Sequence, residues 1–295
     1  MTNNRLRPYH QTDMPSPRSV PVTVVVLTLN EEANISRCLL SAAWASQVVV
    51  VDSGSSDHTV EIARALGAEV IFQEWLGFSE QREFALRAPS IKNEWIYFVD
   101  ADEWICPQLA TEIAGQLRSP EHAAYIHRLR LVFQGKWIRH CGWYKGSWVV
   151  RLVDRRLTRY DGSQVGERAR VDGPVGRLRY DIVDEDRKGF ESWLHKHVRY
   201  ARLEALRRQQ LATSGRRSPV CDTSDTRPLI RAVMKDMVFP VIPTKPLALF
   251  IYMYILRLGF LDGRAGLRFC FYHAWYELSV GVFLTEVSTT ARSET

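Results

Sequence analysis

The first hundred residues alternate between short apolar runs and segments with a helical pattern. Apolar, β-branched runs occupy residues 22–29, 48–51, 69–72 and 95–99. Residues 33–42 place apolar side chains on one helix face, and residues 60–66 predict a second helix that stops at Gly67. Strands that alternate with helices predict an α/β fold with a mostly parallel, Rossmann-like sheet. Because the strands are almost continuously apolar, we expect helices on both faces of this sheet.

Polar residues follow three of these strands. The first strand ends at Asn30 and Glu31, and the fourth ends at Asp100-Ala101-Asp102. The second strand leads into a small, polar loop at residues 52–57, which contains Asp52, Ser53, Gly54 and Asp57. Open α/β sheets bind ligands at the carboxyl ends of their strands, so these residues predict one polar crevice.

Asp100 and Asp102 are the most informative pair in this crevice. Side chains two positions apart on an extended segment point the same way, so the two carboxylates repel each other unless a cation lies between them. Mg²⁺ or Mn²⁺, held by one or two carboxylates and a diphosphate, is the cation that such a pair favours. The alternative is a polar strand end before a helix, with Glu103 as a charge at the helix N-terminus.

The three motifs together resemble a known family. Their order and spacing are similar to the signature segments of family 2 glycosyltransferases with the GT-A fold. Further segments resemble the branch that includes lipopolysaccharide core β-glucosyltransferases, and the resemblance covers roughly residues 20–285. These further segments are residues 81–86, 135–143, 150–155 and 259–267.

The resemblance implies roles for the residues of the crevice. It implies that Asp102 holds the metal, that Asp100 lies near the ribose or the metal, and that Asp52 contacts the nucleobase or the ribose. It also implies a nucleotide-sugar donor, with UDP as the expected nucleotide, close to Glu31 and Asn30. Transfer is expected to invert the anomeric centre.

Transfer to a hydroxyl also requires a general base, and a carboxylate serves this purpose in glycosyl chemistry. The candidates after the acidic strand are Glu167, Asp172, Asp184, Glu185 and Asp186. Val165-Gly166-Glu167 resembles the Val-His-Glu segment of the branch, which implies that Glu167 is the base. Gly166 replaces the histidine of that segment, a departure that is expected to change acceptor orientation or the pKa of the carboxyl group. The alternative is that Glu167 is a turn carboxylate paired with Arg168 or Arg170.

Aromatic residues near the middle of the chain are candidates for acceptor binding. Trp143, Tyr144 and Trp148 offer flat faces that match the apolar faces of sugars. Packing in the core is an equally good explanation for any one of them.

The C-terminal third has a different composition. Residues 187–217 predict an amphipathic helix with a basic face, and residues 247–258 and 269–284 are apolar and aromatic but interrupted by charges. We interpret these segments as interfacial helices on an anionic membrane. The alternative is a helical hairpin buried against the catalytic domain or a second subunit. The domain prediction is a disordered tail at 1–19, a catalytic domain at 20–189 and a helical extension at 190–295.

Composition completes the sequence-based prediction. The chain has 295 residues, 46% of them hydrophobic, and a net charge of +6. Five scattered cysteines without metal-ligand spacing favour reduced thiols, and the polar tail shows no export signal. We therefore expect a cytoplasmic protein, peripheral at the inner membrane, that acts on a lipopolysaccharide core or other lipid-linked glycan. No recognition motif indicates nucleic acid.

Two other classes of function stay open. A sugar nucleotidyltransferase would share the sheet and the metal site, but a Gly-rich basic loop is expected after its first strand, where this chain has Asn30 and Glu31. A non-catalytic, membrane-associated scaffold would not need the carboxylates.

Overall fold

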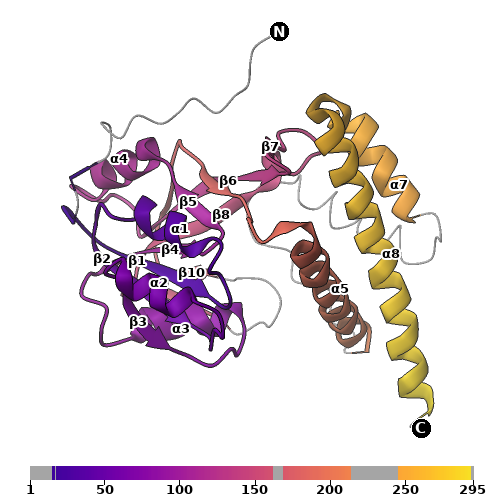
Figure 1. Cartoon of the computed structure of the whole chain (residues 1–295), viewed down its shortest axis with the longest axis horizontal. Coiled ribbons are helices and arrows are strands. Elements are labelled where there is room, and N and C mark those ends of the chain that lie inside the picture. Colours follow the sequence, from indigo (N-terminus) through magenta and orange to yellow (C-terminus); the bar gives the residue numbers. More distant parts are fainter. Residues whose placement is uncertain (1–14, 17, 162–168, 214–244, 294–295) are drawn as a thin grey trace. The chain divides into compact units, whose positions relative to one another are not determined.

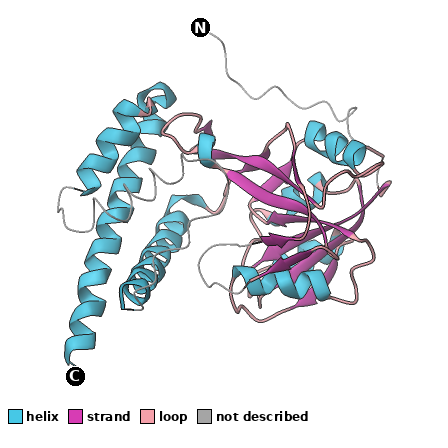
Figure 2. Cartoon of the chain, turned by 180° about the vertical axis from the view of Figure 1, so that it is seen from behind, coloured by secondary structure: helices cyan, strands magenta, loops and turns pink. Residues whose placement is uncertain are grey.

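The computed structural model describes residues 15–16, 18–161, 169–213 and 245–293. They fall into two compact units, which are described separately (Figures 1 and 2). The first unit runs to Trp137 and continues from Trp143 to Gly189, and the second comprises Ile138–Gly142 and the chain from Phe190 onward.

The first unit contains the predicted catalytic domain, and we call it the catalytic unit. Its first half is a parallel sheet in the order β3-β2-β1-β4. Helices connect these strands, as the alternation in the sequence predicts. The strands are β1 (Val20–Thr28), β2 (Ala45–Asp52), β3 (Glu69–Phe72) and β4 (Trp95–Asp100). The helices are α1 (Ile35–Ser41), α2 (Thr59–Ala65) and α3 (Phe78–Arg87).

The second half of the sheet is mixed. β8 (Trp148–Asp154) runs antiparallel to β4 and to β6 (Ala124–Phe133), while β12 (Ile182–Asp184) runs parallel to β6. The α/β class is confirmed, but the parallel arrangement is complete only from β3 to β4. The remaining elements are β5 (Glu103–Ile105), α4 (Pro107–Gln116), β7 (Lys136–Trp137), η2 (Tyr144–Gly146), β9 (Thr158–Tyr160), β10 (Ala169–Val171) and β11 (Val175–Arg177).

The core lies on both faces of the sheet. Along β4, Tyr97 and Val99 join one hydrophobic cluster, and Ile96 and Phe98 join another. Apolar side chains of α1 and α4 complete the first cluster, and those of α3 complete the second. Strand residues alternate between faces, so a continuously apolar strand fits a sheet with helices on both sides.

One polar pair is buried within this core. The Tyr97 hydroxyl lies 2.9 Å from Nε2 of His127, and Nδ1 of His127 lies 3.2 Å from the carbonyl oxygen of Arg128. A neutral ring that donates from Nδ1 and accepts at Nε2 satisfies both contacts. Burial, together with the nearby charge of Arg151, lowers the pKa of His127 to about 3 from its ordinary 6.5.

This shift predicts how stability changes with pH. Between pH 6.5 and about 3 the unfolded His127 binds a proton that the folded one does not. Its contribution is therefore complete above pH 6.5 and falls with pH by about 1.4 kcal/mol per unit. Urea unfolding at pH 7.0 and 5.5 should show a smaller loss for His127→Gln than for the wild type. His58→Gln, at an exposed position on the same unit, is the control. Equal losses for all three proteins would contradict a neutral, buried His127.

The second unit is helical. α5 packs on α8 through the buried side chains of Ala201, Ala205 and Val280. Arg208 of α5 and Lys245 of α7 both form ion pairs with Glu277 of α8. The described helices of this unit are α5 (Gly189–Thr213), α7 (Lys245–Ile251), the π-helix η3 (Tyr252–Leu256), η4 (Gly259–Asp262) and α8 (Gly263–Ser293).

No single helix among the described residues has the length and apolar composition of a membrane span. One bent pair, Lys245–Leu256 with Gly259–Val287, meets both criteria together, at an angle of 73°.

The short segment Ile138–Gly142 belongs to the helical unit, although it follows β7 in the chain. The buried carboxylate of Asp262 accepts hydrogen bonds from the backbone N–H of His140, at 2.8 Å, and contacts Nδ1 of the same residue. The thiol sulfurs of Cys141 and Cys270 lie 3.4 Å apart. Asp262 therefore anchors the loop that leads to η2.

Candidate active site

The strand register brings the three polar loops to one edge of the sheet. Thr28 at the end of β1 pairs with Asp52 at the end of β2, and Leu27 pairs with Asp100 at the end of β4. All three strands are parallel, so the loops after them leave the sheet side by side. The crevice predicted from the sequence is therefore present in the geometry of the catalytic unit.

Asp52 organises the second of these loops. Its side chain is buried, and one carboxylate oxygen accepts hydrogen bonds from the backbone N–H groups of Gly54 and Ser55, at 2.9 Å each. The other oxygen accepts from the hydroxyls of Thr28 and Ser55. Gly54 has a φ of +94°, which favours glycine over residues with a side chain. The structure thus shows Asp52 fixing the loop, and its contact with a nucleobase or ribose stays a prediction.

The first loop is tied to the second. Asn30 adopts a φ of +55°, and its side-chain oxygen accepts a hydrogen bond from the backbone N–H of Ser56 at 2.8 Å. Asp57 accepts from the backbone N–H of Glu32 and from the hydroxyl of Thr59. Partial burial works against ionisation of Asp57, but these hydrogen bonds outweigh it and lower the pKa of its carboxyl group. Ser53 donates its backbone N–H to the carbonyl of Thr28 at 3.0 Å.

Glu31 lies next to Asp102. Burial raises the pKa of the Glu31 carboxyl group, and the charge of Asp102 adds to this rise. Hydrogen bonds from Lys188 and Asn34 oppose it without cancelling it. Two acidic side chains from different strand ends therefore share one small region of the edge.

Residues 185–188, which follow β12, form a strap across this region. Arg37 of α1 pairs with the Glu185 carboxylate, and the Glu185 backbone N–H donates to the carbonyl of Asp102 at 3.0 Å. The buried amide of Asn34 donates to Asp186 at 2.9 Å and accepts from the backbone N–H of Arg187. The strap thus fixes the start of α1 and the position of Glu31, a role that the sequence did not predict for it.

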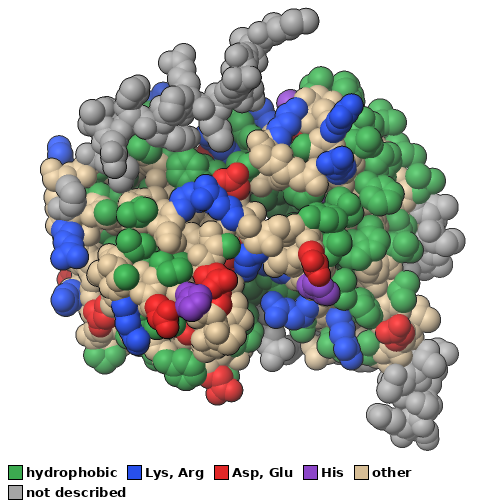
Figure 3. Space-filling model, viewed as in Figure 1, with side chains coloured by type: hydrophobic (Ala, Val, Ile, Leu, Met, Phe, Trp, Pro, Cys, Tyr) green, Lys and Arg blue, Asp and Glu red, His purple; other side chains and the backbone are tan. Residues whose placement is uncertain are grey.

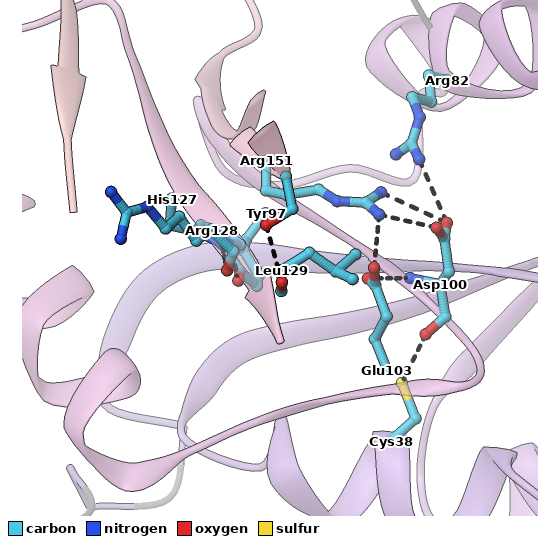
Figure 4. Close-up of polar contacts among 10 residues, drawn as sticks. Cys38, Arg82, Tyr97, Asp100, Glu103, His127, Arg128, Leu129 and Arg151 are labelled. Carbon is cyan, nitrogen blue, oxygen red and sulfur yellow. Dashed lines mark hydrogen bonds and ion pairs between the residues drawn. The ribbon is translucent and has the colours of Figure 1, made fainter. Parts of the chain in front are cut away.

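Asp100 is held by two arginines (Figure 4). Arg151 contacts one carboxylate oxygen at 2.8 Å, and Arg82 contacts the other at 3.2 Å. Arg151 also pairs with Glu103 at 2.6 Å, and Glu103 accepts a hydrogen bond from the backbone N–H of Asp100. Both guanidinium groups and Glu103 are buried, so removing one charge would leave others without compensation.

This network bears on two of the sequence-based interpretations. Glu103 does not lie at a helix N-terminus, because it begins strand β5 and its carboxylate is buried against Arg151. Because two arginines already compensate the charge of the Asp100 carboxylate, Asp102 is the better candidate for a metal ligand. A contact between Asp100 and the ribose or the metal stays a prediction.

The donor set is compatible with a divalent cation that a substrate helps to bind. Among the residues that the structure describes, no group of three or more His, Cys, Asp or Glu side chains is arranged to hold a metal. The acidic oxygens of Asp102 and Glu31 are of the type that Mg²⁺ or Mn²⁺ prefers. Since Mg²⁺ is commonly held by one or two carboxylates plus phosphates, Asp102 and a diphosphate would suffice.

The expected general base, Glu167, lies outside the described residues. Of the other candidates, Asp172 forms an exposed ion pair with Arg159 at 3.1 Å. Glu185 and Asp186 belong to the strap, and Asp184 ends β12 opposite Glu103. The assignment of the base to Glu167 therefore stays a prediction from the resemblance.

The structure separates the three aromatic candidates. Tyr144 and Trp148 both lie against the guanidinium group of Arg128, at 5.0 and 4.7 Å from the ring centroids. Trp143 is exposed at the start of η2. Tyr144 and Trp148 thus form one cluster, and an acceptor contact for any of the three stays a prediction.

Comparison with known proteins supports the family inferred from the motifs. A model of the glycosyl transferase family 2 matches residues 23–165. A glycosyltransferase of Rickettsia typhi is 36% identical over 118 residues, which are 39% of this chain and 40% of that protein. The match thus spans well under half of that relative.

Two further proteins are similar over different shares of the chain. The lipopolysaccharide core biosynthesis glycosyltransferase LpsC of Rhizobium meliloti is 27% identical over 67% of this chain and 74% of LpsC. The glucosyl-3-phosphoglycerate synthase of Mycobacterium tuberculosis, solved with Mn²⁺ and UDP, is 20% identical over 47% of this chain and 58% of that one, with a TM-score of 0.35.

The family match begins in β1 and includes all three polar loops at the edge of the sheet. The described helices of the second unit follow this region as a C-terminal extension. Residues 23–165 of the chain therefore match the family 2 glycosyltransferases, and the described part of this region has the α/β fold that the sequence predicted.

Proposed function

We propose that this chain transfers a sugar from a nucleoside-diphosphate sugar, with UDP as the expected nucleotide, to a hydroxyl of a glycan acceptor. The observation that carries the proposal is the convergence of the loops at Glu31, Asp52 and Asp102 on one edge of the sheet. The family match over this region supports the reaction class.

Each part of the edge has a distinct task in this proposal. The loop that Asp52 fixes, together with Asn30, would receive the nucleoside. Mg²⁺ or Mn²⁺ at Asp102, when bound, neutralises the charge that develops on the departing diphosphate. Lys188 keeps Glu31 in place beside Asp102. Glu167 would take the proton of the acceptor hydroxyl, and a single displacement would invert the anomeric centre.

The proposed acceptor is a lipopolysaccharide core or another lipid-linked glycan. The similarity to LpsC supports this class, because it extends over 67% of the chain and therefore beyond the length of the family match.

A ligand panel followed by a transfer assay tests the proposal. Full-length protein is heated with UDP-, GDP- and dTDP-sugars, each with and without Mn²⁺, and the productive donor raises the unfolding temperature by mass action. Isotope from that donor should then appear in a lipid-extracted product. A sugar nucleotidyltransferase would instead consume a nucleoside triphosphate and release pyrophosphate. A scaffold would show neither reaction.

We also propose that the helical unit binds the cytoplasmic surface of the inner membrane. Hydrophobic side chains gather over its helices in Figure 3. Leu247, Leu256 and Leu261 are 61%, 69% and 53% exposed. The exposed guanidinium group of Arg264 lies three residues after Leu261, so apolar and cationic groups occur together. Both kinds of group favour an anionic lipid surface.

Vesicle sedimentation gives the first test of membrane binding. Leu256→Glu combined with Leu261→Glu should release the protein from anionic vesicles, because a carboxylate is repelled by anionic lipid and removes an apolar contact with the interface. Leu40→Glu, an equally exposed position on α1, should leave binding unchanged. High salt should weaken binding of the wild type.

A second variant tests the contribution of α5. Arg199→Glu combined with Arg202→Glu should also weaken binding, since both side chains are exposed. Arg207 and Arg208 are unsuitable for this test because they pair with Glu204. Wild-type protein that stays in the supernatant with anionic vesicles at low salt would contradict the membrane proposal.

A further inference from the structure

A cluster of arginines and aromatic rings occupies the catalytic unit beside the predicted donor site. The guanidinium group of Arg128 lies against the rings of Tyr144 and Trp148, and that of Arg177 lies 5.3 Å from the centroid of the same Trp148 ring. Arg128 pairs with Trp148 in the ladder between β6 and β8. We call these four residues the arginine–aromatic cluster.

The cluster lies at the same end of the sheet as the three polar loops. β8 runs antiparallel to β4, so Trp148 at the start of β8 is near the level at which β4 ends in Asp100. The ion pair between Arg151 of β8 and Asp100 shows that the two strand ends meet. A group bound at the cluster would thus lie on the edge where the acceptor hydroxyl has to approach the donor.

The described carboxylates do not form ion pairs with the two arginines of the cluster. Asp181 is nearby, but its carboxylate pairs with Arg130 at 3.2 Å and accepts the Tyr144 hydroxyl at 2.9 Å. Within the described part of the chain, no carboxylate lies within salt-bridge distance of Arg128 or Arg177. The Nε atom of Arg128 is buried, and none of the described atoms accepts a hydrogen bond from it.

The stacking determines which ligand such a site favours. Aromatic rings cover the faces of a guanidinium group, while its N–H donors lie in the plane and stay available. In-plane donors of arginine match the oxygens of a phosphate or a carboxylate. The half-buried rings of Tyr144 and Trp148 add a surface for the apolar face of a sugar.

We propose that the arginine–aromatic cluster binds an oxyanion on the acceptor sugar, so that this enzyme prefers a phosphorylated or carboxylated sugar over a neutral one. The inference rests on the proposed function, since it names the acceptor class of that same site. Arg128 supplies the principal contact and Arg177 a second, more exposed one.

Calorimetric titration of the full chain, saturated with UDP and Mn²⁺ so that the donor site is filled, tests the proposal. The probes are glucose 6-phosphate, glucuronate, glucose and inorganic phosphate. At least one charged sugar should bind about tenfold or more tightly than glucose. Glucose 6-phosphate and glucuronate distinguish a phosphate from a carboxylate as the preferred oxyanion.

Variants locate the binding. Arg128→Gln should weaken the charged sugar about tenfold or more and leave glucose unaffected, and Arg177→Gln should weaken the charged sugar by a smaller factor. Arg128→Lys should restore part of the affinity, because it keeps the charge but loses the planar donors. Arg64→Gln removes one exposed charge on α2 and should change nothing. Because Arg177 is exposed, its variant remains informative if Arg128→Gln does not fold.

Three outcomes would overturn the proposal. One is equal binding of charged and neutral sugars, and a second is undiminished binding of the charged sugar in both Arg128→Gln and Arg177→Gln. The third is inorganic phosphate that binds as tightly as glucose 6-phosphate, since the site would then recognise free phosphate. Failure of every nucleotide sugar to stabilise the protein would count against the proposed function alone, because the charged and neutral sugars would then be titrated into the protein without UDP.

Discussion

Replacing Asp102 with asparagine is expected to lower sugar transfer by about 10²–10³-fold, because the metal supplies several kcal/mol of charge stabilisation to the departing diphosphate. Asparagine keeps the size of the side chain and removes the charge that holds the cation beside Glu31. Initial rates are measured on metal-depleted protein to which Mn²⁺ is returned. The wild type should recover its activity, and Asp102→Asn should not.

The matched control for this variant is Asp161→Asn, at a carboxylate of the same unit that pairs with Arg170 of β10 and does not belong to the loops after β1, β2 and β4. It should behave like the wild type. Turnover of Asp102→Asn at the wild-type rate with chelator present would show that the metal assignment is wrong.

Glu167→Gln is expected to lower turnover by about 10²-fold or more, the usual contribution of a general base. Glutamine preserves the shape of the side chain but does not accept the acceptor proton, so donor affinity should change little. Turnover is measured by isotope transfer and donor affinity by thermal shift. The product of the wild type should carry a β-linkage from an α-linked donor.

Two results would change the assignment of the base. Retained turnover in Glu167→Gln would move the base to Asp172, Asp184 or Asp186. An α-linked product would contradict transfer by a single displacement.

The parallel half of the sheet was predictable because a local pattern in the sequence marks each of its strands. β3 has the same bounds as the predicted run at residues 69–72. β4 contains the predicted run at residues 95–99 and is longer by one residue, Asp100. The helices α1 and α2 were also expected in their places. In these segments the strand or helix pattern, the turn residues and the burial all favour the same structure.

The second half of the sheet was not predicted, for a physical reason. β6 carries His127, Arg128 and Arg130 among its apolar residues, so neither a continuous apolar run nor strict alternation marks it as a strand. His127 and Arg130 contact partners far away in the sequence, Tyr97 and Asp181. Pairings of this kind are fixed by the tertiary structure and are not visible in a local pattern.

The sequence predicted where the candidate site lies, but it did not predict which side chains contact one another there. The strand ends that carry Asn30, Asp52 and Asp100 meet as expected, because parallel strands end at one edge. The partners of these carboxylates could not be foreseen. Asp52 accepts hydrogen bonds from its own loop and from Thr28 of the neighbouring strand, whereas Asp100 pairs with Arg82 and Arg151 from elements far apart in the chain.

The strap of residues 185–188 affects how the protein is made. Asn34 and its partner Asp186 are separated by 152 positions. At ribosomal rates of 5–20 residues per second, the first loop is exposed roughly 8–30 s before the strap that completes it. During that interval Glu31 and Arg37 do not yet have their ion-pair partners, Lys188 and Glu185. The edge of the nascent parallel sheet that carries the polar loops is therefore not yet stabilised by the strap. We expect the nucleotide-binding region to reach its final form only when this last part of the catalytic unit has left the ribosome.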